Sequence, residues 1–141
     1  MQFDFDVEAG DFANAGRVSS EIKKILKELN IDAMTIRKTV VALFESEVNV
    51  VGHSWGGSIS VDISSRKIHI LVSDTGPGIA DIDLAMSEGY STADEQIREM
   101  GFGAGMGLPN IRKNTDSLEI RSEEGKYTEV EMEIILPGGE S

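Results

Sequence analysis

The sequence predicts an α+β two-layer sandwich in which helices cover one face of a mixed, mainly antiparallel sheet. Three observations support this prediction. Alternating apolar and polar residues, the pattern of half-buried strands, recur at the start, in the middle and at the end of the chain. Turns too short for a parallel crossover join the middle and the final strand pairs. Two segments with helical spacing follow the first strand, so they can collect on one face.

Composition limits the class of protein. With 141 residues, 40% of them hydrophobic, the chain fits one domain over residues 1–141. No apolar run approaches the roughly 20 residues that cross a bilayer, and the first residues lack a basic signal, so we expect a cytoplasmic protein without a membrane partner. The absence of cysteine excludes disulfides and thiolate metal sites. A net charge of −12 argues against nucleic acid and favours protein partners with basic surfaces.

The first part of the chain predicts a strand and two helices. Phe3, Phe5 and Val7 alternate with polar residues, as in a half-buried strand. Apolar residues fall at helical spacing from Ala15 to Leu29. Asp32 can cap a second, longer helix that runs to about residue 52.

The middle of the chain predicts a hairpin followed by a lid. Residues 59–63 alternate, residues 68–72 are almost continuously apolar, and a short turn near 64–66 separates them. The second strand ends at Asp74, before a Gly-Pro-Gly turn. The polar, acidic segment that follows has no clear core face, so we expect a mobile lid at about 80–104.

A glycine stands at every second position from Gly101 to Gly107. Because glycine has no Cβ, such a loop can turn backbone N–H groups toward a bulky anion such as a polyphosphate. Pro109 then suits the first turn of a helix, whose N-terminus also favours anions. The alternative is a flexible linker, against which the apolar residues Phe102 and Met106 argue.

The chain ends in two predicted strands. Leu118 and Ile120 indicate one, and residues 129–134 alternate in the other, with a turn at Gly125-Lys126. The predicted order is therefore β-α-α-β-β-lid-α-β-β.

Three polar residues suggest chemistry. Glu45 and Asn49 are four residues apart on the second helix, so they project from the same face. A carboxylate and an amide oxygen suit magnesium or an attacking hydroxyl, although such a pair is ordinarily a solvated helix face. Asp74 can accept a hydrogen bond from an exocyclic amine, and its alternative role is to initiate the turn.

The ordered set of motifs resembles the N, G1, G2 and G3 boxes of the GHKL ATPases, the superfamily of gyrase, Hsp90-type chaperones, histidine kinases and mismatch-repair ATPases, which share the Bergerat ATP-binding fold. The motifs are Glu45-x-x-x-Asn49, Asp74-x-Gly76-x-Gly78, Gly101-x-Gly103-x-Gly105-x-Gly107 and Gly125-x-x-Thr128. Within the superfamily the chain resembles the single-domain anti-sigma factor serine/threonine kinases and switch kinases. That likeness rests on residues 88–92, on residues 105–109, and on Asn49 followed by His53.

The resemblance implies a site for ATP and magnesium. Asp74 would bind the adenine amino group, assisted by the Thr128 hydroxyl. Asn49 would hold magnesium, and Glu45 would be the general base that prepares the attacking hydroxyl. The remaining implied nucleotide-binding residues come from two loops: Gly76, Gly78 and Ile79 near the base and ribose, and Gly101, Gly103, Ala104, Gly105, Met106, Gly107 and Leu108 around the triphosphate.

The implied function is transfer of the γ-phosphate to a serine or threonine of a small regulatory protein of the anti-anti-sigma, STAS-like type. A sigma factor is a second implied partner, and a homodimer is compatible with the resemblance. Two alternatives stay open. The first is a histidine-kinase-like ATPase domain, although the chain begins with its own strand and helix and leaves no space for a phosphoacceptor hairpin. The second is a nucleotide-gated, non-catalytic protein-binding regulator.

Three residues depart from a simple reading of the motifs. Glu47 falls on the apolar side of its helix, so we expect it to be buried and protonated, or paired with a cation. His53 is interpreted as a structural residue at the helix end rather than a catalytic one. Trp55 is interpreted as a packing residue or a partner contact, outside the nucleotide site.

Overall fold

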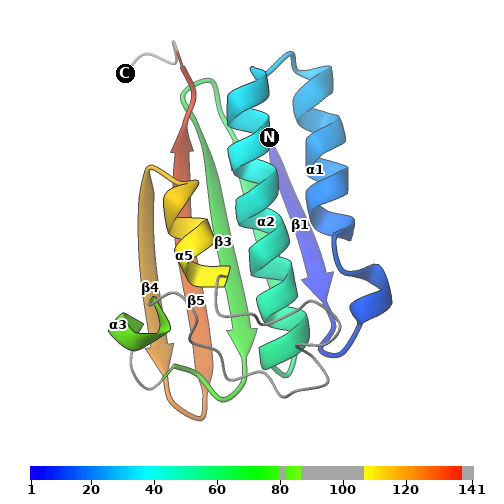
Figure 1. Cartoon of the computed structure of the whole chain (residues 1–141). Coiled ribbons are helices and arrows are strands. Elements are labelled where there is room, and N and C mark those ends of the chain that lie inside the picture. The colour runs from blue at the N-terminus through cyan, green and yellow to red at the C-terminus, as the bar shows by residue number, and fades with distance from the viewer. Residues whose placement is uncertain (80–81, 87–106, 138–141) are drawn as a thin grey trace.

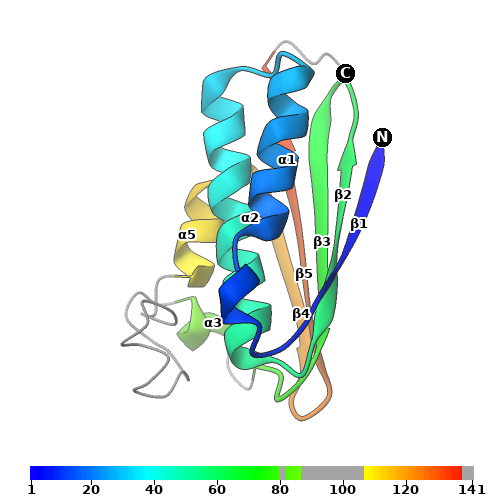
Figure 2. The same ribbon diagram turned by 90° about the vertical axis from the view of Figure 1, so that its right-hand side faces the viewer.

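The protein has two layers, a sheet and a set of helices that covers one of its faces (Figures 1 and 2). The computed structural model describes residues 1–79, 82–86 and 107–137. The elements are β1 (Gln2–Val7), η1 (Phe12–Asn14), α1 (Arg17–Glu28), α2 (Ala33–His53), β2 (Gly57–Ile63), β3 (Lys67–Thr75), α3 (Ile82–Ala85), α5 (Gly107–Lys113), β4 (Ser117–Glu123) and β5 (Tyr127–Ile135). This architecture confirms the predicted α+β two-layer sandwich.

The five strands follow the order β1-β2-β3-β5-β4. A mixed, mainly antiparallel sheet was expected, and all four pairings among the described strands are antiparallel. The predicted hairpin is present as β2 and β3, and the predicted final pair as β4 and β5. β3 is central, between β2 and β5, so the end of β3 lies beside the start of β5.

The core lies between the helices and the sheet. In β2, β3 and β5, alternate residues point toward the helices and are buried, while their neighbours form the uncovered face. On β3 the buried set is Ile68, Ile70 and Val72, and on β5 it is Val130, Met132 and Ile134. The uncovered face carries polar contacts instead, including the ion pair of Lys67 with Glu133 and the hydrogen bond between His69 and Glu131, each at 2.6 Å. The strict alternation explains why these strands were predictable from sequence.

The long helix α2 begins where the sequence predicts. The carboxylate of Asp32 accepts hydrogen bonds from the backbone N–H of Thr35 at 3.0 Å and from its hydroxyl at 2.7 Å. This cap satisfies one of the N–H groups that have no partner inside the helix.

Helix α1 is capped by a residue of α2. Its own cap position, Gly16, has a φ of 101° and provides no side chain. The carboxylate of Glu47 supplies the acceptor, because its Oε1 accepts a hydrogen bond from the backbone N–H of Val18 at 3.1 Å. Glu47 is only 2% exposed. Burial raises the pKa of this carboxyl, and hydrogen bonds from the backbone of residues 16–18 oppose that rise.

The expectation for Glu47 is therefore half correct. The side chain is buried, as expected, but its main partners are the N–H groups at the start of α1 and not a cation. The positive end of a helix stabilises a carboxylate, which explains how this acid is accommodated in the core. A sequence pattern within α2 alone cannot show a partner that comes from another helix.

Among the described residues, no helix has the length and apolar character needed to span a membrane. Most of the predicted lid, from about 80 to 104, lies outside the described residues; the short helix α3 falls within its first part.

Candidate functional site

The two candidate residues on α2, Glu45 and Asn49, both face α5. Asn110 of α5 donates a hydrogen bond from Nδ2 to Oε2 of Glu45 at 2.6 Å. Gly107 lies against Asn49 so closely that a Cβ at that position would be 2.9 Å from Asn49 Oδ1. The structure thus places Glu45 and Asn49 in one contact zone with the helix that follows the glycine loop, which removes the ordinary alternative of a fully solvated helix face.

Helix α5 is fixed by apolar residues on its inner side. Pro109 is buried, Ile111 is completely buried, and Leu108 packs against the core cluster. The other loop residues predicted to surround the triphosphate lie outside the described residues: Gly101, Gly103, Ala104, Gly105 and Met106.

A row of small and polar residues crosses the end of the sheet. The antiparallel register sets Gly57 of β2 opposite Asp74 of β3, Asp74 opposite Thr128 of β5, and Thr128 opposite Ser122 of β4. Asp74 and Thr128 continue the lines of core residues Val72 and Val130, so they point to the helix-covered face. We call Gly57, Asp74, Thr128 and Ser122 the polar row.

Asp74 is half-buried in this row. Burial raises the pKa of its carboxyl to about 6, and a hydrogen bond from the backbone of Thr128 opposes the rise. No larger residue fits at Gly57, because a Cβ there would lie 2.9 Å from the Cβ of Asp74 and 2.2 Å from the carbonyl oxygen of Ser73. The row therefore leaves a carboxylate partly dehydrated beside a position with no side chain.

The hydroxyl of Thr128 is held by Ser122. The two oxygens are 2.9 Å apart, and Ser122 donates its one hydroxyl proton to the carbonyl oxygen of Tyr127 at 2.8 Å. Thr128 must then be the donor in the contact with Ser122, so its own oxygen is left as an acceptor only. Ser122 also accepts a hydrogen bond from the backbone N–H of Ile79 at 2.7 Å, which fixes the predicted Asp74–Ile79 turn to β4.

The predicted glycines of this turn are explained by packing. A Cβ on Gly76 would lie 3.0 Å from the Cα of Ser54, at the end of α2. Gly78 has a φ of +71°, and a Cβ there would be 2.4 Å from the carbonyl oxygen of Glu123. The turn is further bonded to the β4–β5 hairpin, since Gly125 N–H donates to the Pro77 carbonyl at 2.6 Å. Close packing and backbone conformation therefore explain why glycine is required at both positions, and no contact with a ligand is needed for that explanation.

The residues that follow Asn49, at the end of α2 and directly after it, lie beside the end of β3 that carries Asp74. His53 is in the last turn of α2, as expected of a helix-end residue, and burial lowers the pKa of its imidazole. The backbone N–H of Trp55 donates to the carbonyl of Thr75 at 2.8 Å, directly after Asp74. The Trp55 side chain is 64% exposed, so of its two predicted roles a partner contact fits and core packing does not.

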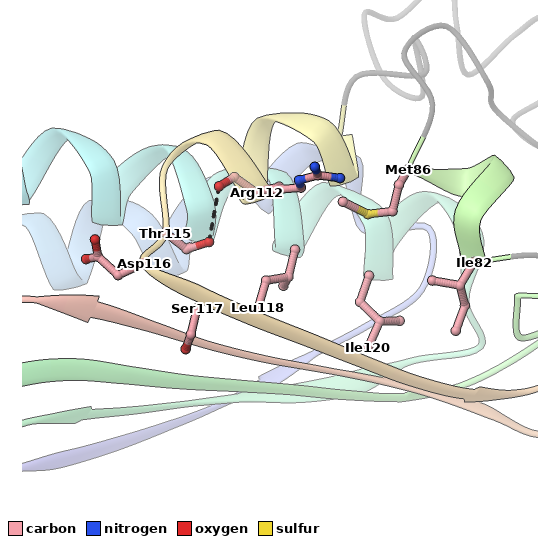
Figure 3. Close-up of a pocket in the computed structure, with 8 residues that line it drawn as sticks. All are labelled: Ile82, Met86, Arg112, Thr115, Asp116, Ser117, Leu118 and Ile120. Atoms are coloured by element: carbon pink, nitrogen blue, oxygen red, sulfur yellow. Dashed lines mark hydrogen bonds between the residues drawn. The ribbon is translucent and has the colours of Figure 1, made fainter.

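A pocket of about 400 Å³ opens elsewhere, between α3, α5 and β4 (Figure 3). It is lined by Ile82, Met86, Arg112, Thr115, Asp116, Ser117, Leu118 and Ile120. Its floor is apolar, and the Thr115 hydroxyl lies 3.0 Å from the backbone carbonyl oxygen of Ile111 and 3.5 Å from that of Arg112 (Figure 3). None of the predicted site residues lines this pocket, so its volume is no guide to the chemistry of the polar row.

Two residues of the site were missed by sequence reasoning. Asn110 and Ser122 contact Glu45 and Thr128, respectively, through the fold and not through local spacing. The only sequence signal for Ser122 was its place in the strand that pairs with the one carrying Thr128. Asn110 had no signal beyond its place in the helix after the glycine loop.

Residues 35–138 match the family of histidine kinase-, DNA gyrase B- and HSP90-like ATPases. The chain is 27% identical over 113 residues to the serine/threonine-protein kinase RsbT of Bacillus subtilis, covering 77% of this chain and 79% of the relative. It is 32% identical over 111 residues to an anti-sigma F factor of Clostridium kluyveri, covering 75% and 73%. It is 30% identical over 114 residues to the adaptive-response sensory kinase SasA of a Synechococcus species, which covers 76% of this chain but only 29% of that kinase.

The fold also matches a chain in the crystal structure of the SiaB–SiaC complex from Pseudomonas aeruginosa. The TM-score is 0.57, and the match covers 94% of this chain and 88% of the other. At 12% identity this similarity shows the fold alone. The family match and the relatives confirm the resemblance drawn from the four motifs. The chain belongs to the family of histidine kinase-, DNA gyrase B- and HSP90-like ATPases.

Proposed function

We propose that the chain is a serine/threonine protein kinase of the anti-sigma type, which transfers the γ-phosphate of ATP to a hydroxyl of a small regulatory protein. Use of ATP follows from the family. The observation that supports the kinase step best is the placement of Glu45 and Asn49 together against α5, the helix that follows the glycine loop. The extent of the similarity agrees with it, since the chain spans most of RsbT and little of the sensory kinase.

The polar row would receive the adenine base. Asp74 offers a carboxylate and Thr128 an oxygen that only accepts, so both favour a ligand group that donates. Adenine presents its exocyclic amine at the position where guanine presents a carbonyl oxygen. A carboxylate facing that oxygen would be left dehydrated and unpaired, which is costly. The row therefore supports a preference for adenine.

Magnesium would enter with the nucleotide. Mg²⁺ usually keeps several waters and binds through substrate phosphates and one or two protein oxygens, so the single amide oxygen of Asn49 suits it. Among residues 1–79, 82–86 and 107–137 no group of three acidic or histidine side chains forms a separate metal site. When bound, the ion neutralises phosphate charge, and the glycines from Gly101 to Gly107 would surround the triphosphate.

Glu45 would act as the general base. As the partner's hydroxyl oxygen bonds to the γ-phosphorus, the bond to the β–γ bridging oxygen breaks, ADP leaves, and Glu45 takes the hydroxyl proton. Phosphoryl transfer depends mainly on positioning and charge neutralisation. The proposed reaction therefore needs only one oriented carboxylate, Glu45, beside Asn49, the residue that would hold magnesium.

The partner we propose is a regulatory protein of the anti-anti-sigma, STAS-like type, with a sigma factor as a second partner and a homodimer as the working assembly. The net charge of −12 favours a basic partner surface, and exposed Trp55 lies beside the end of β3 that carries Asp74. A single domain over residues 1–141 with a lid at about 80–104 is part of this proposal.

Radioactive ATP labelled at the γ-phosphate tests the function. The chain is incubated with magnesium and purified candidate regulatory proteins, and the label on each protein is followed after acid and after alkali treatment. Acid-stable label on the partner supports the serine/threonine kinase. Acid-labile label would indicate histidine phosphorylation, and ATP-dependent binding without label would indicate a non-catalytic regulator; either outcome would overturn the proposal.

A further inference from the structure

We propose that Asn110 is a positioning residue that orients the Glu45 carboxylate for proton transfer. This inference rests on the proposed function of Glu45. The carrying observation is the hydrogen bond from Asn110 Nδ2 to Glu45 Oε2, at 2.6 Å, between side chains that are 65 residues apart in the chain.

The contact is part of a two-point attachment between helices. Gly107 lies against Asn49, and three residues later Asn110 meets Glu45, which is four residues earlier on α2. The two helices therefore run in opposite directions along this contact. The packing of α5 on α2 that fixes the position of Asn49 also fixes the position of Glu45. Ile111, completely buried beside Asn110, fixes the rotation of α5 about its own axis.

Orientation matters because a glutamate side chain is long and loses much rotamer freedom when it is held in one geometry. Glu45 is only half-buried, so packing alone does not fix its carboxylate. With Oε2 engaged by Asn110, Oε1 is assigned to the incoming hydroxyl. A base oriented in turn by a third group is a recurrent arrangement in enzymes, and misplacement by about 1 Å can be costly in rate.

The chemistry of the amide suits this role. An asparagine donates to the carboxylate without bringing a formal charge, so Glu45 can still take up a proton. A lysine or arginine in its place would favour the charged carboxylate and oppose protonation. An aspartate would replace the donor with an acceptor and repel Glu45.

Asn114, directly after α5, provides a matched control. Its Nδ2 donates to the backbone carbonyl of Asn110 at 2.8 Å, so it supports the end of α5 through a bond to the backbone. Asn114→Ala removes the same functional group from the residue that follows α5, and reports the effect of loosening that helix alone.

The first test examines the contact in the full chain without ligand. NMR compares the side-chain amide resonances of Asn110 in the wild type and in Glu45→Ala, which has no side-chain acceptor for them. The resonances should differ between the two proteins, because the hydrogen bond to Glu45 Oε2 is lost. Resonances of Asn110 at the same positions in both proteins would overturn the contact and the inference with it.

The second test measures the role. Two quantities are measured: the rate of phosphate release from γ-labelled ATP with magnesium, where water is the acceptor, and the affinity for ATP by calorimetry. The proteins compared are wild type, Asn110→Ala, the isosteric Asn110→Asp, Asn114→Ala and Glu45→Gln. Both Asn110 variants should release phosphate about tenfold or more slowly while ATP affinity changes by about twofold or less, the scale expected for a residue that orients a reactive group. Asn114→Ala should stay near the wild-type rate.

The outcomes separate the inference from the function on which it rests. A slow Glu45→Gln beside unimpaired Asn110 variants would overturn the positioning role and leave the proposed function in place. Equal rates in wild type and Glu45→Gln would overturn the base role of Glu45 and the positioning role that rests on it, while the kinase proposal would still be decided by labelled ATP with partner proteins. A loss in Asn114→Ala equal to that in Asn110→Ala would mean that the helix, and not the Asn110 amide, is responsible.

Discussion

Asp74 carries a partly buried carboxylate at the end of β3, and the proposed adenine contact would use it. Burial raises the pKa of its carboxyl from the ordinary 3.8 to about 6 in the folded chain. The folded state therefore holds the proton more tightly than the unfolded state does. For this group, stability is greatest at low pH and falls as pH rises from about 4 through about 6.

This shift makes Asp74→Asn a variant with opposite effects on the two properties. At about pH 7.5 it should raise the free energy of unfolding of the ligand-free chain by about 1 to 3 kcal/mol, because the dehydrated charge is removed. ATP affinity should fall by about tenfold or more, because the acceptor for the adenine amine is weakened. Denaturant unfolding at several pH values and calorimetry with ATP measure both. A variant that is no more stable at high pH than wild type would contradict the assigned burial of Asp74.

Ser122 is predicted to set the base specificity through Thr128. In Ser122→Ala the Thr128 hydroxyl loses its fixed acceptor and can rotate to donate to a carbonyl oxygen. The ratio of ATP to GTP affinity should therefore fall by about threefold to tenfold, the scale of one hydrogen bond. Calorimetry with both nucleotides measures the ratio, and Ser60→Ala, which removes a hydroxyl from the uncovered face of β2, is the control. An unchanged ratio with weaker binding of both nucleotides would mean that Ser122 only supports the turn through Ile79.

The residue-scale predictions from sequence succeeded where a motif is local. The spacing of Glu45 and Asn49 fixes their shared face, and the Gly-Pro-Gly turn fixes Asp74 at a strand end. Asn110 and Ser122 were not predicted because their partners come from other elements, and an asparagine in a helix or a serine in a strand has many ordinary roles.

At the scale of elements, Glu47 links two helices that neighbour each other in sequence. Glu47→Gln keeps an oxygen that can accept from Val18, so we expect a change of about 1 kcal/mol or less in the free energy of unfolding. Glu47→Ala leaves N–H groups of α1 without an acceptor and opens a cavity, so a loss of about 2 to 4 kcal/mol is expected.

The pH dependence supplies the control for this prediction. Because burial raises the pKa of Glu47, the contribution of this carboxyl to stability declines as pH rises above its ordinary pKa of 4.5. In Glu47→Gln, this part of the decline in the free energy of unfolding with rising pH should be absent. Chemical denaturation across this range measures it, and a Glu47→Ala variant as stable as wild type would show that the cap contributes nothing.

Element boundaries were predictable because capping and turn residues mark them. Asp32 caps α2 as predicted, and the alternation in β1, β3 and β5 matches the observed burial. The start of α1 was less sharply defined by sequence, since its cap position is a glycine and its acceptor comes from α2.

At the scale of the whole molecule, the strand order was the feature that sequence could not supply. Turn lengths predict that β2 pairs with β3 and β4 with β5, but nothing local predicts that β5 crosses to pair with β3. That pairing is what sets Asp74 beside Thr128. The polar row is therefore a product of topology, even though each of its members stands in an ordinary strand.

The last prediction concerns the coupling of ATP to the stability of the whole fold. A ligand that binds only the folded state stabilises it in proportion to the logarithm of its concentration, by about 2.7 kcal/mol at 100 times its dissociation constant. For a chain of this size that corresponds to a rise of about 5 to 10 °C in melting temperature. The polar row belongs to the sheet, and Asn49 belongs to α2 in the helical layer. ATP with magnesium should therefore stabilise both layers together, and one cooperative unfolding transition should shift to higher temperature. ATP with a chelator should give a smaller shift, Asp74→Asn with ATP about half of the shift or less, and GTP almost none. Differential scanning calorimetry measures these shifts, and an equal rise with GTP and with ATP would refute adenine recognition by the polar row.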